Sequence, residues 1–197
     1  AGPFDIAAGD LDRDGVPDLA VAAPDAPRIE VLLMRSNGSV KSRAVVSSVE
    51  SRGLTIADVT RDGALDVVVS DYARNRIVVL PGNSRGGFLA ARTYSIGVRP
   101  QGVTVADFNR DGFPDIAVAN TTGSVLTVLH GTSSAAVTSR TFAAGRTHNV
   151  LTALDINSDG WFDIAAASTA TNVVSFFRGS SSGFALAGTR ATGGRSR

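Results

Sequence analysis

The sequence contains no cysteine, which excludes a disulfide-stapled scaffold, a cysteine zinc site and a thiol nucleophile. It has only two histidines, so general bases and transition-metal ligands of that type are scarce. No apolar run approaches the roughly 18 residues that cross a bilayer, and we expect no membrane span. The net charge of +1 gives no support to nucleic-acid binding. With 43% hydrophobic residues, the chain can nevertheless bury a core.

The acidic residues, in contrast, are concentrated. Of the 18 Asp and Glu residues in the 197-residue chain, 13 fall in four short segments with the pattern Asp-x-(Asp/Asn/Thr)-x-Asp-Gly-x-x-Asp. The first aspartates of these segments lie 48, 49 and 48 positions apart, so four repeats of about 49 residues account for nearly the whole chain. The segments are Asp10–Asp18, Asp58–Asp66, Asp107–Asp115 and Asp155–Asp163.

Each repeat has the same succession of short apolar runs, rich in Val, Ile and Phe and separated by turn residues, which is typical of strands. In the first repeat these runs are Phe4–Ala8, Leu19–Ala23, Ile29–Leu33 and a weaker run around Val45. None is long enough for a periodic helix. The pattern predicts an all-β fold, a β-propeller of four-stranded antiparallel blades that is either a whole small propeller or part of a larger ring.

We expect a single repeat domain over residues 1–197. Its predicted parts are blades at about 4–50, 51–99, 100–147 and 148–190, followed by a flexible tail at 191–197. Three arrangements remain open: four blades that close alone, a piece of a longer chain, or a ring completed by self-association. An open array would leave two blade faces exposed and would tend to associate.

The acidic segments have the form of calcium loops. Calcium takes 6–8 oxygen ligands at about 2.3–2.6 Å, and oxygens at loop positions 1, 3 and 5 converge if the chain turns sharply at the glycine of position 6. The carbonyl of position 7 and the carboxylate of position 9 would complete the shell. We therefore predict up to four Ca²⁺ ions, one per repeat, with four solvated Asp-Gly turns as the alternative. The candidate ligands are Asp10, Asp12, Asp14, Val16 and Asp18; Asp58, Thr60, Asp62, Ala64 and Asp66; Asp107, Asn109, Asp111, Phe113 and Asp115; and Asp155, Asn157, Asp159, Trp161 and Asp163.

The four sites are not expected to be equal. The first loop has four carboxylates and should bind most tightly, whereas Asn109 and Asn157 keep an oxygen at position 3 but lose its charge. Thr60 is a poorer ligand, so the site at Asp58 should be the weakest. Magnesium is a poorer candidate because it prefers octahedral geometry and retains water. Three loops have arginine at position 4, and we expect these side chains to point into solvent: Arg13, Arg61 and Arg110.

These segments resemble the FG-GAP/VCBS repeats of integrin α-subunit propellers, fungal propeller lectins and many bacterial surface or secreted proteins. Asp18–Pro24 follows the family pattern after the acidic loop, with Ala22 where the family usually has Gly, and Asp115–Asn120 is similar. The resemblance covers about residues 4–190. It implies a β-propeller with calcium in the loop between the first two strands of each blade. The family usually closes with seven blades, and Thr60 departs from its pattern.

The resemblance and the loops together suggest a non-enzymatic calcium-binding module of an extracellular or cell-surface protein that binds protein or carbohydrate. No secretion signal opens the sequence. Four bound calcium ions would raise the formal charge to about +9, which favours an acidic partner.

Three other functions remain open, namely a calcium-dependent lectin, a propeller-type hydrolase or lyase, and a structural spacer. Gly179–Gly183 fits the Gly-x-Ser-x-Gly pattern of serine hydrolases, but no helix is expected after it. His130 and His148 do not recur between repeats, and we expect them to be ordinary surface or turn residues. Trp161 is expected to pack beside the fourth loop, with a sugar-stacking platform as the alternative.

Overall fold

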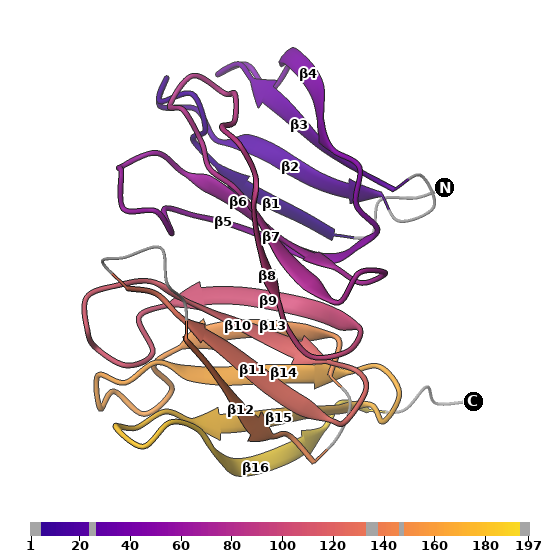
Figure 1. Cartoon of the computed structure of the whole chain (residues 1–197), viewed down its shortest axis with the longest axis vertical. Helices are drawn as coiled ribbons and strands as arrows, with labels where there is room; N and C mark the ends of the chain where they lie inside the picture. Colours follow the sequence, from indigo (N-terminus) through magenta and orange to yellow (C-terminus); the bar gives the residue numbers. More distant parts are fainter. Residues whose placement is uncertain (1–4, 24–26, 133–137, 146–147, 194–197) are drawn as a thin grey trace. The chain divides into compact units, whose positions relative to one another are not determined.

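The computed structural model describes residues 5–23, 27–132, 138–145 and 148–193. Over these residues the chain forms strands and turns but no helix, and hence no helix that could span a membrane. Sixteen strands form four separate four-stranded sheets, each made of consecutive antiparallel strands (Figure 1). The predicted all-β fold of four-stranded blades is therefore confirmed. Residues 194–197 of the predicted tail lie outside the described residues.

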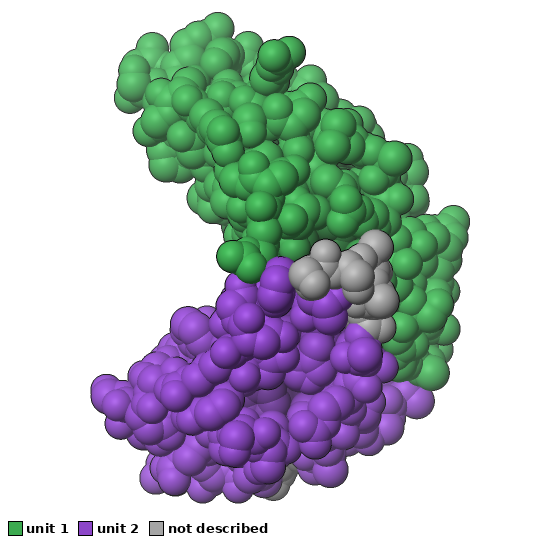
Figure 2. Space-filling view, turned by 60° about the vertical axis from the view of Figure 1, so that its left-hand side comes forward, with its two compact units in different colours: residues 1–100 green, residues 101–197 purple. Residues whose placement is uncertain are grey.

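The structure divides into two compact units, residues 1–100 and 101–197 (Figure 2). The first unit holds two blades. Its first blade consists of β1 (Asp5–Gly9), β2 (Asp18–Ala23), β3 (Arg28–Met34) and β4 (Val40–Ser47). Its second blade consists of β5 (Ser51–Ala57), β6 (Asp66–Asp71), β7 (Arg76–Leu80) and β8 (Arg92–Ser95).

The second unit repeats this plan. Its first sheet, the third blade, consists of β9 (Pro100–Ala106), β10 (Asp115–Asn120), β11 (Val125–His130) and β12 (Thr138–Ala143). The fourth blade consists of β13 (Val150–Leu154), β14 (Asp163–Ser168), β15 (Val173–Arg178) and β16 (Ala185–Ala191). In every blade the acidic loop connects the first strand to the second, and the position-9 aspartate is the first residue of that second strand.

Each unit has its own hydrophobic core between its two sheets. In the first unit Ala20 and Val31 of one blade and Val67 and Val78 of the next are almost completely buried in one cluster. The core of the second unit is built in the same way, around Phe177 and its neighbours. Burying a Val, Leu or Ile side chain contributes about 1.5–3 kcal/mol, so stacking of the sheets holds neighbouring blades together and fixes the loops at their ends.

The first and fourth blades each leave one sheet face partly exposed. Residues of β2 alternate between buried and half-buried, whereas β6 is buried along its whole length. On the first blade Ile6 and Val45 lie in one cross-strand row, and each is 57% exposed. On the fourth blade Val150 is 59% exposed. These faces carry exposed apolar side chains, which a propeller blade can bury by stacking against another blade.

Candidate metal centres

All four acidic segments form the same turn. In the first loop the carboxylate of Asp10 accepts the N–H groups of Asp14 at 3.1 Å and Gly15 at 2.9 Å. The carboxylate of Asp14 accepts the N–H of Val16 at 3.0 Å. The corresponding three bonds recur in the other loops at 2.8–3.2 Å. The repeated aspartates thus shape the backbone of each loop as well as offering oxygens.

The turn needs two left-handed residues. The glycines at position 6 have φ of 82–83°, as the pattern predicts. Position 4 is also left-handed, with φ of 57–60°, although it is never glycine. A side chain in that region costs about 1–2 kcal/mol, which the carboxylate–backbone bonds on either side offset. The residues at position 4 are Arg13, Arg61, Arg110 and Ser158.

The position-9 aspartates are the buried carboxylates of the loops, with exposures of 0–2%. Asp18 accepts the N–H of Leu11 at 2.9 Å and the N–H of Met34, at the end of β3, at 2.8 Å. The other three blades have the same pair of bonds at 2.7–3.0 Å. The sequence pattern predicts these carboxylates only as metal ligands, but they also connect each loop by hydrogen bonds to the end of the third strand or the residues just after it.

A glycine follows the third strand in three blades and was missed by sequence reasoning. Gly82, Gly131 and Gly179 each donate their N–H to the position-9 carboxylate. A Cβ on any of them would lie far inside contact distance of a backbone carbonyl oxygen at loop position 8. The sequence contains a signal for this contact, because each glycine lies 16 residues after the position-9 aspartate of its blade. In the first blade Met34 takes this place.

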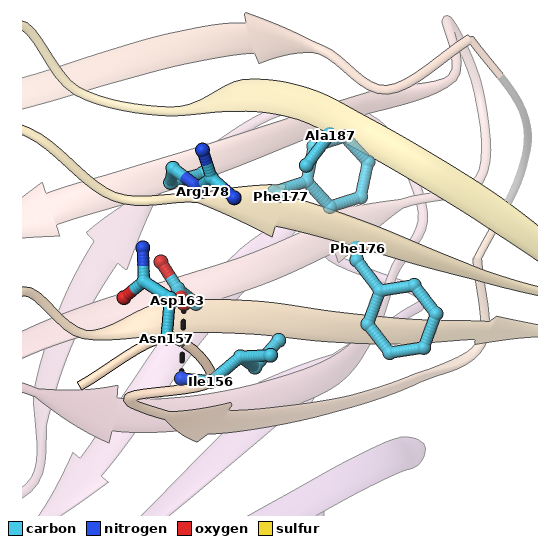
Figure 3. A pocket seen from close by; sticks show the side chains of 7 residues that line it. All are labelled: Ile156, Asn157, Asp163, Phe176, Phe177, Arg178 and Ala187. Atoms are coloured by element: carbon cyan, nitrogen blue, oxygen red, sulfur yellow. Dashed lines mark hydrogen bonds between the residues drawn. The ribbon is translucent and has the colours of Figure 1, made fainter. Parts of the chain in front are cut away.

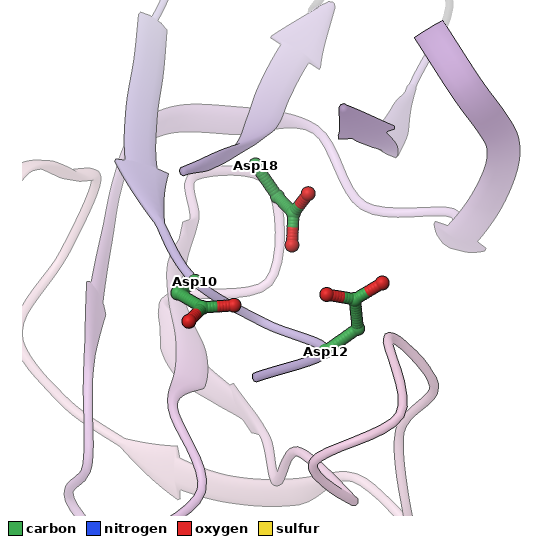
Figure 4. A group of neighbouring side chains, drawn as sticks. All are labelled: Asp10, Asp12 and Asp18. Atoms are coloured by element: carbon green, nitrogen blue, oxygen red, sulfur yellow. The ribbon is translucent and has the colours of Figure 1, made fainter. Parts of the chain in front are cut away.

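Three carboxylates of the first loop converge. Oxygens of Asp10, Asp12 and Asp18 all lie within 4.8 Å of one another (Figure 4). Oxygens bound to one calcium ion are separated by up to about 5 Å, so these three fit around a single ion. The donors are hard oxygens without sulfur or nitrogen, which suits calcium or magnesium. Ligation through the position-7 carbonyls stays a prediction; they belong to Val16, Ala64, Phe113 and Trp161.

Position 3 acts differently in the third and fourth loops. The side chain of Asn109 accepts the N–H of Asp111 at 2.9 Å and donates its amide N–H to the same residue's carboxylate at 2.9 Å. Asn157 makes both bonds with Asp159, at 3.2 and 2.8 Å. In the second loop the backbone N–H of Thr60 donates to the position-9 carboxylate at 3.0 Å. Asparagine thus supplies a donor to the position-5 aspartate.

Charges beside the loops and burial shift several pKa values. A hydrogen bond from Lys41 lowers the pKa of the Asp14 carboxyl, and bonds to Asp12 and Asp14 raise the pKa of Lys41. Burial raises the pKa of Asp66 and of Asp115, although the Nδ1 atom of His130 lies 3.3 Å from the carboxylate of Asp115. A carboxylate that burial makes costly to ionise is one that a bound cation would stabilise.

The prediction that the position-4 arginines point into solvent is wrong for two of them. Both are exposed, but Arg13 donates to the carbonyl oxygen of Gly63 in the next loop. Arg110 donates to the carbonyls of Gly160 at 3.0 Å and Asp159 at 2.9 Å. The left-handed backbone at position 4 directs these side chains across to the following blade. Within each unit an arginine therefore links consecutive loops.

The same arginine also covers the only tryptophan. The guanidinium carbon of Arg110 lies 4.3 Å from the ring centroid of Trp161, which is half-buried beside the fourth loop. Arginine stacked on an indole is a favourable cation–π contact. The ring thus packs beside the fourth loop as expected, and Arg110 covers a ring face on which a sugar would stack.

Family comparisons agree with the loop geometry. A model of the FG-GAP-like repeat matches residues 10–69 and 58–118, and a model of the FG-GAP repeat matches residues 100–138. These matches cover more than half of the chain. The chain belongs to the FG-GAP repeat family. The hydrogen bonds of the fourth loop place an FG-GAP-type turn in the last blade as well. No curated protein matches the chain by sequence.

Solved structures share the fold of this FG-GAP repeat protein at low identity. BBS1N in complex with ARL6DN is 18% identical with a TM-score of 0.65, and the match covers 96% of this chain and 55% of that one. A protein of unknown function from Bacteroides caccae is 12% identical with a TM-score of 0.59, covering 96% and 60%. The V. cholerae biofilm matrix protein Bap1 is 19% identical with a TM-score of 0.50, covering 93% and 30%. The chain thus spans about half of the first two proteins and a smaller part of the third.

The two histidines and the hydrolase-like motif lie in different surroundings. His148 lies in the connection between β12 and β13, in line with the expected surface or turn position, but it is 1% exposed, packs on Phe177 and has Nε2 2.9 Å from the hydroxyl of Ser175. His130 is half-buried beside the third loop. Gly179–Gly183 lies between β15 and β16. The strand-to-helix turn that a serine nucleophile requires is therefore not formed there.

A small pocket borders the fourth loop (Figure 3). Its lining includes Asn157 and Asp163 of the loop, the ring of Phe176 and the guanidinium-bearing Arg178. Apolar and charged groups thus lie together beside the fourth loop, within a single blade.

Proposed function

We propose that the chain is a non-enzymatic, calcium-binding module of β-propeller blades that binds a protein or carbohydrate partner outside the cell. One observation carries the proposal. All four blades hold the same oxygen-rich turn between their first two strands, and in the first of them three carboxylates converge within 4.8 Å. A single acidic turn would be unremarkable, whereas four with matching hydrogen bonds form a repeated donor set suited to calcium.

Calcium binding by loops of this kind is consistent with an extracellular location. Modules of extracellular proteins bind calcium with dissociation constants of about 10⁻⁴–10⁻³ M. Partly exposed loops with three or four carboxylates each would be occupied at calcium concentrations of that range. The bound ions would neutralise carboxylates that otherwise repel one another, and they would leave the module positively charged.

The fold and the charge of the module support a protein or glycan partner. The structurally similar BBS1N was solved in complex with ARL6DN, so a fold of this kind can carry a protein-binding surface. A calcium-loaded, basic module favours an acidic protein or glycan. The apolar faces of the first and fourth blades also support self-association that completes a propeller ring.

A calcium-dependent lectin is the second candidate, and the pocket beside the fourth loop favours it. An aromatic ring next to a metal loop is one way to hold a sugar, and Phe176 supplies that ring. A glycan screen with calcium and with chelator separates the two functions. Reproducible calcium-dependent sugar binding that is lost in Phe176→Ala supports the lectin.

Thermal unfolding tests the main proposal. Circular dichroism would be recorded with excess calcium, with excess magnesium and with chelator. A ligand that binds only the native state at ten times its dissociation constant stabilises it by about 1.4 kcal/mol per site. We expect a calcium-specific rise in melting temperature that shrinks in Asp10→Asn, Asp107→Asn and Asp155→Asn. Absence of a shift with any cation would refute the calcium sites.

A further inference from the structure

Lys41 is the only lysine in the sequence, and a strand irregularity places it against the first loop. In the pairing of β3 with β4, Met34 lies opposite Val40 and Leu33 lies opposite Ser42, so Lys41 is the extra residue of a β-bulge. Bulges redirect a side chain away from the regular alternation of a strand. Here the ammonium group reaches the carboxylates of its own blade's acidic loop.

The contacts of Lys41 involve two predicted calcium ligands. Its Nζ atom lies 2.7 Å from Asp12 Oδ2 and 2.9 Å from Asp14 Oδ2, at loop positions 3 and 5. The side chain of Asp12 is only 8% exposed, so solvent screens this contact less than a surface ion pair. An ammonium group and a calcium ion would therefore compete for the carboxylates of these two predicted ligands.

The contact of Lys41 changes the formal charge of the first loop relative to the other three. The first loop has four carboxylates and each of the others has three. With Lys41 included, the carboxylates and the ammonium of the first loop give a formal charge of −3, equal to that of the carboxylates in each other loop. Lys41 also donates to the position-5 carboxylate, as Asn109 and Asn157 do in their loops.

We propose that Lys41 is a tethered cation that competes with calcium for Asp12 and Asp14 and thereby lowers the calcium affinity of the first loop. The inference rests on the proposed calcium binding and deepens it. It changes an expectation from the sequence, because the fourth carboxylate of the first loop then no longer makes that loop the tightest site by charge. Lys41 is 42% exposed, so its side chain has room to swing into solvent when an ion takes its place.

The test needs a signal from one loop at a time. Terbium occupies calcium sites and luminesces when a nearby indole is excited, and the only tryptophan, Trp161, lies at position 7 of the fourth loop. The unmodified chain therefore reports on the fourth loop. A Val16→Trp, Trp161→Phe version moves the indole to position 7 of the first loop. Displacement of terbium by calcium then gives a calcium dissociation constant for either loop in the full chain.

The informative variant is Lys41→Met, which removes the charge and keeps a long side chain. We expect calcium to bind the first loop about tenfold more tightly, because no ammonium group then competes for Asp12 and Asp14. The fourth loop should change by less than about twofold, since the carboxylates that Lys41 contacts belong to the first loop. Lys41→Arg keeps the charge and should leave the affinity near that of the parent.

Arg43→Met is the matched control. Arg43 lies on the same strand and pairs with Glu30 at 2.8 Å rather than with the loop. Its removal changes the net charge by the same amount, and we expect less than about a twofold change in calcium affinity at either loop. Equal effects of Lys41→Met and Arg43→Met would show a general charge effect and overturn the role of Lys41.

The remaining outcomes separate this inference from the calcium proposal. Calcium binding at both loops with no change, or with weaker binding at the first, in Lys41→Met overturns the competition and leaves calcium binding intact. Absence of terbium and calcium binding at both loops overturns both. Circular dichroism checks the fold of each variant, and Lys41→Gln replaces Lys41→Met if that variant does not fold.

Discussion

The first blade and the other three build the same loop with different parts. All four place a buried aspartate at position 9 and bond it to the end of the third strand. In three blades a glycine that approaches the loop backbone follows that strand, whereas the first blade has Met34 there and a β-bulge that carries Lys41. The comparison shows that the loop geometry is set by the aspartates, while its support can be built in two ways.

Substituting the close-approach glycine should have the largest effect. In Gly179→Ala the new methyl group would collide with the carbonyl oxygen of Phe162, so the backbone of the fourth loop must shift. We expect a loss of about 3 kcal/mol in the free energy of unfolding, measured with urea in chelator. Gly188→Ala in the same blade meets no atom within 4 Å and should stay within about 0.5 kcal/mol. Similar effects of both would mean that the glycine is not needed for close approach.

The second-largest effect should be a difference in stability between substitutions of the position-9 and position-1 aspartates of one loop. Asp163→Ala removes the acceptor of one buried and one part-buried backbone N–H group, and we expect a loss of about 2–3 kcal/mol in chelator. The loss should be larger with calcium, because Asp163 is also a predicted ligand. Asp155→Ala removes exposed bonds, with a loss of about 1 kcal/mol in chelator, but it should abolish the calcium response of that loop. Urea unfolding with calcium and with chelator measures both. The distinction fails if Asp155→Ala is the more damaging change in chelator.

The sequence predicts the blades and the acidic loops of this molecule, but not all the contacts that support the loops. The period near 49 residues and the Asp-Gly pattern predict the blades, the strand runs and the loop that joins the first two strands. They do not predict that Asp18 and its counterparts bond the third strand, because that contact depends on residues 16 positions away. They also miss Arg110 and Lys41, whose directions follow from a left-handed backbone and a β-bulge rather than from residue type.

Substitution of the arginine that links consecutive loops should have a smaller effect on the free energy of unfolding. Arg110→Ala removes two hydrogen bonds to the carbonyls of Asp159 and Gly160 and the contact with Trp161. Because the arginine is exposed, we expect a loss of only about 1 kcal/mol, together with a change in tryptophan emission. Urea unfolding followed by fluorescence measures both. Arg190→Ala, in the last strand of the fourth blade, is the control and should leave both unchanged.

The smallest predicted effect is a pH dependence that distinguishes the first loop from the others. The pKa of Asp14 lies below its ordinary value of 3.8 because Lys41 donates a hydrogen bond to it. A carboxyl group with a lowered pKa in the folded state adds stability above its ordinary pKa, and loses it as the pH falls through the lowered value. In chelator, Lys41→Met should therefore be less stable than the parent near neutral pH, and the difference should fade below about pH 3.8. Urea unfolding across that range measures it, with Arg43→Met as a control whose fading follows Glu30 instead. A difference that persists at low pH would mean that Lys41 supports the blade through packing of its hydrocarbon stem, and its charge would then have no part in stabilising the calcium-free loop.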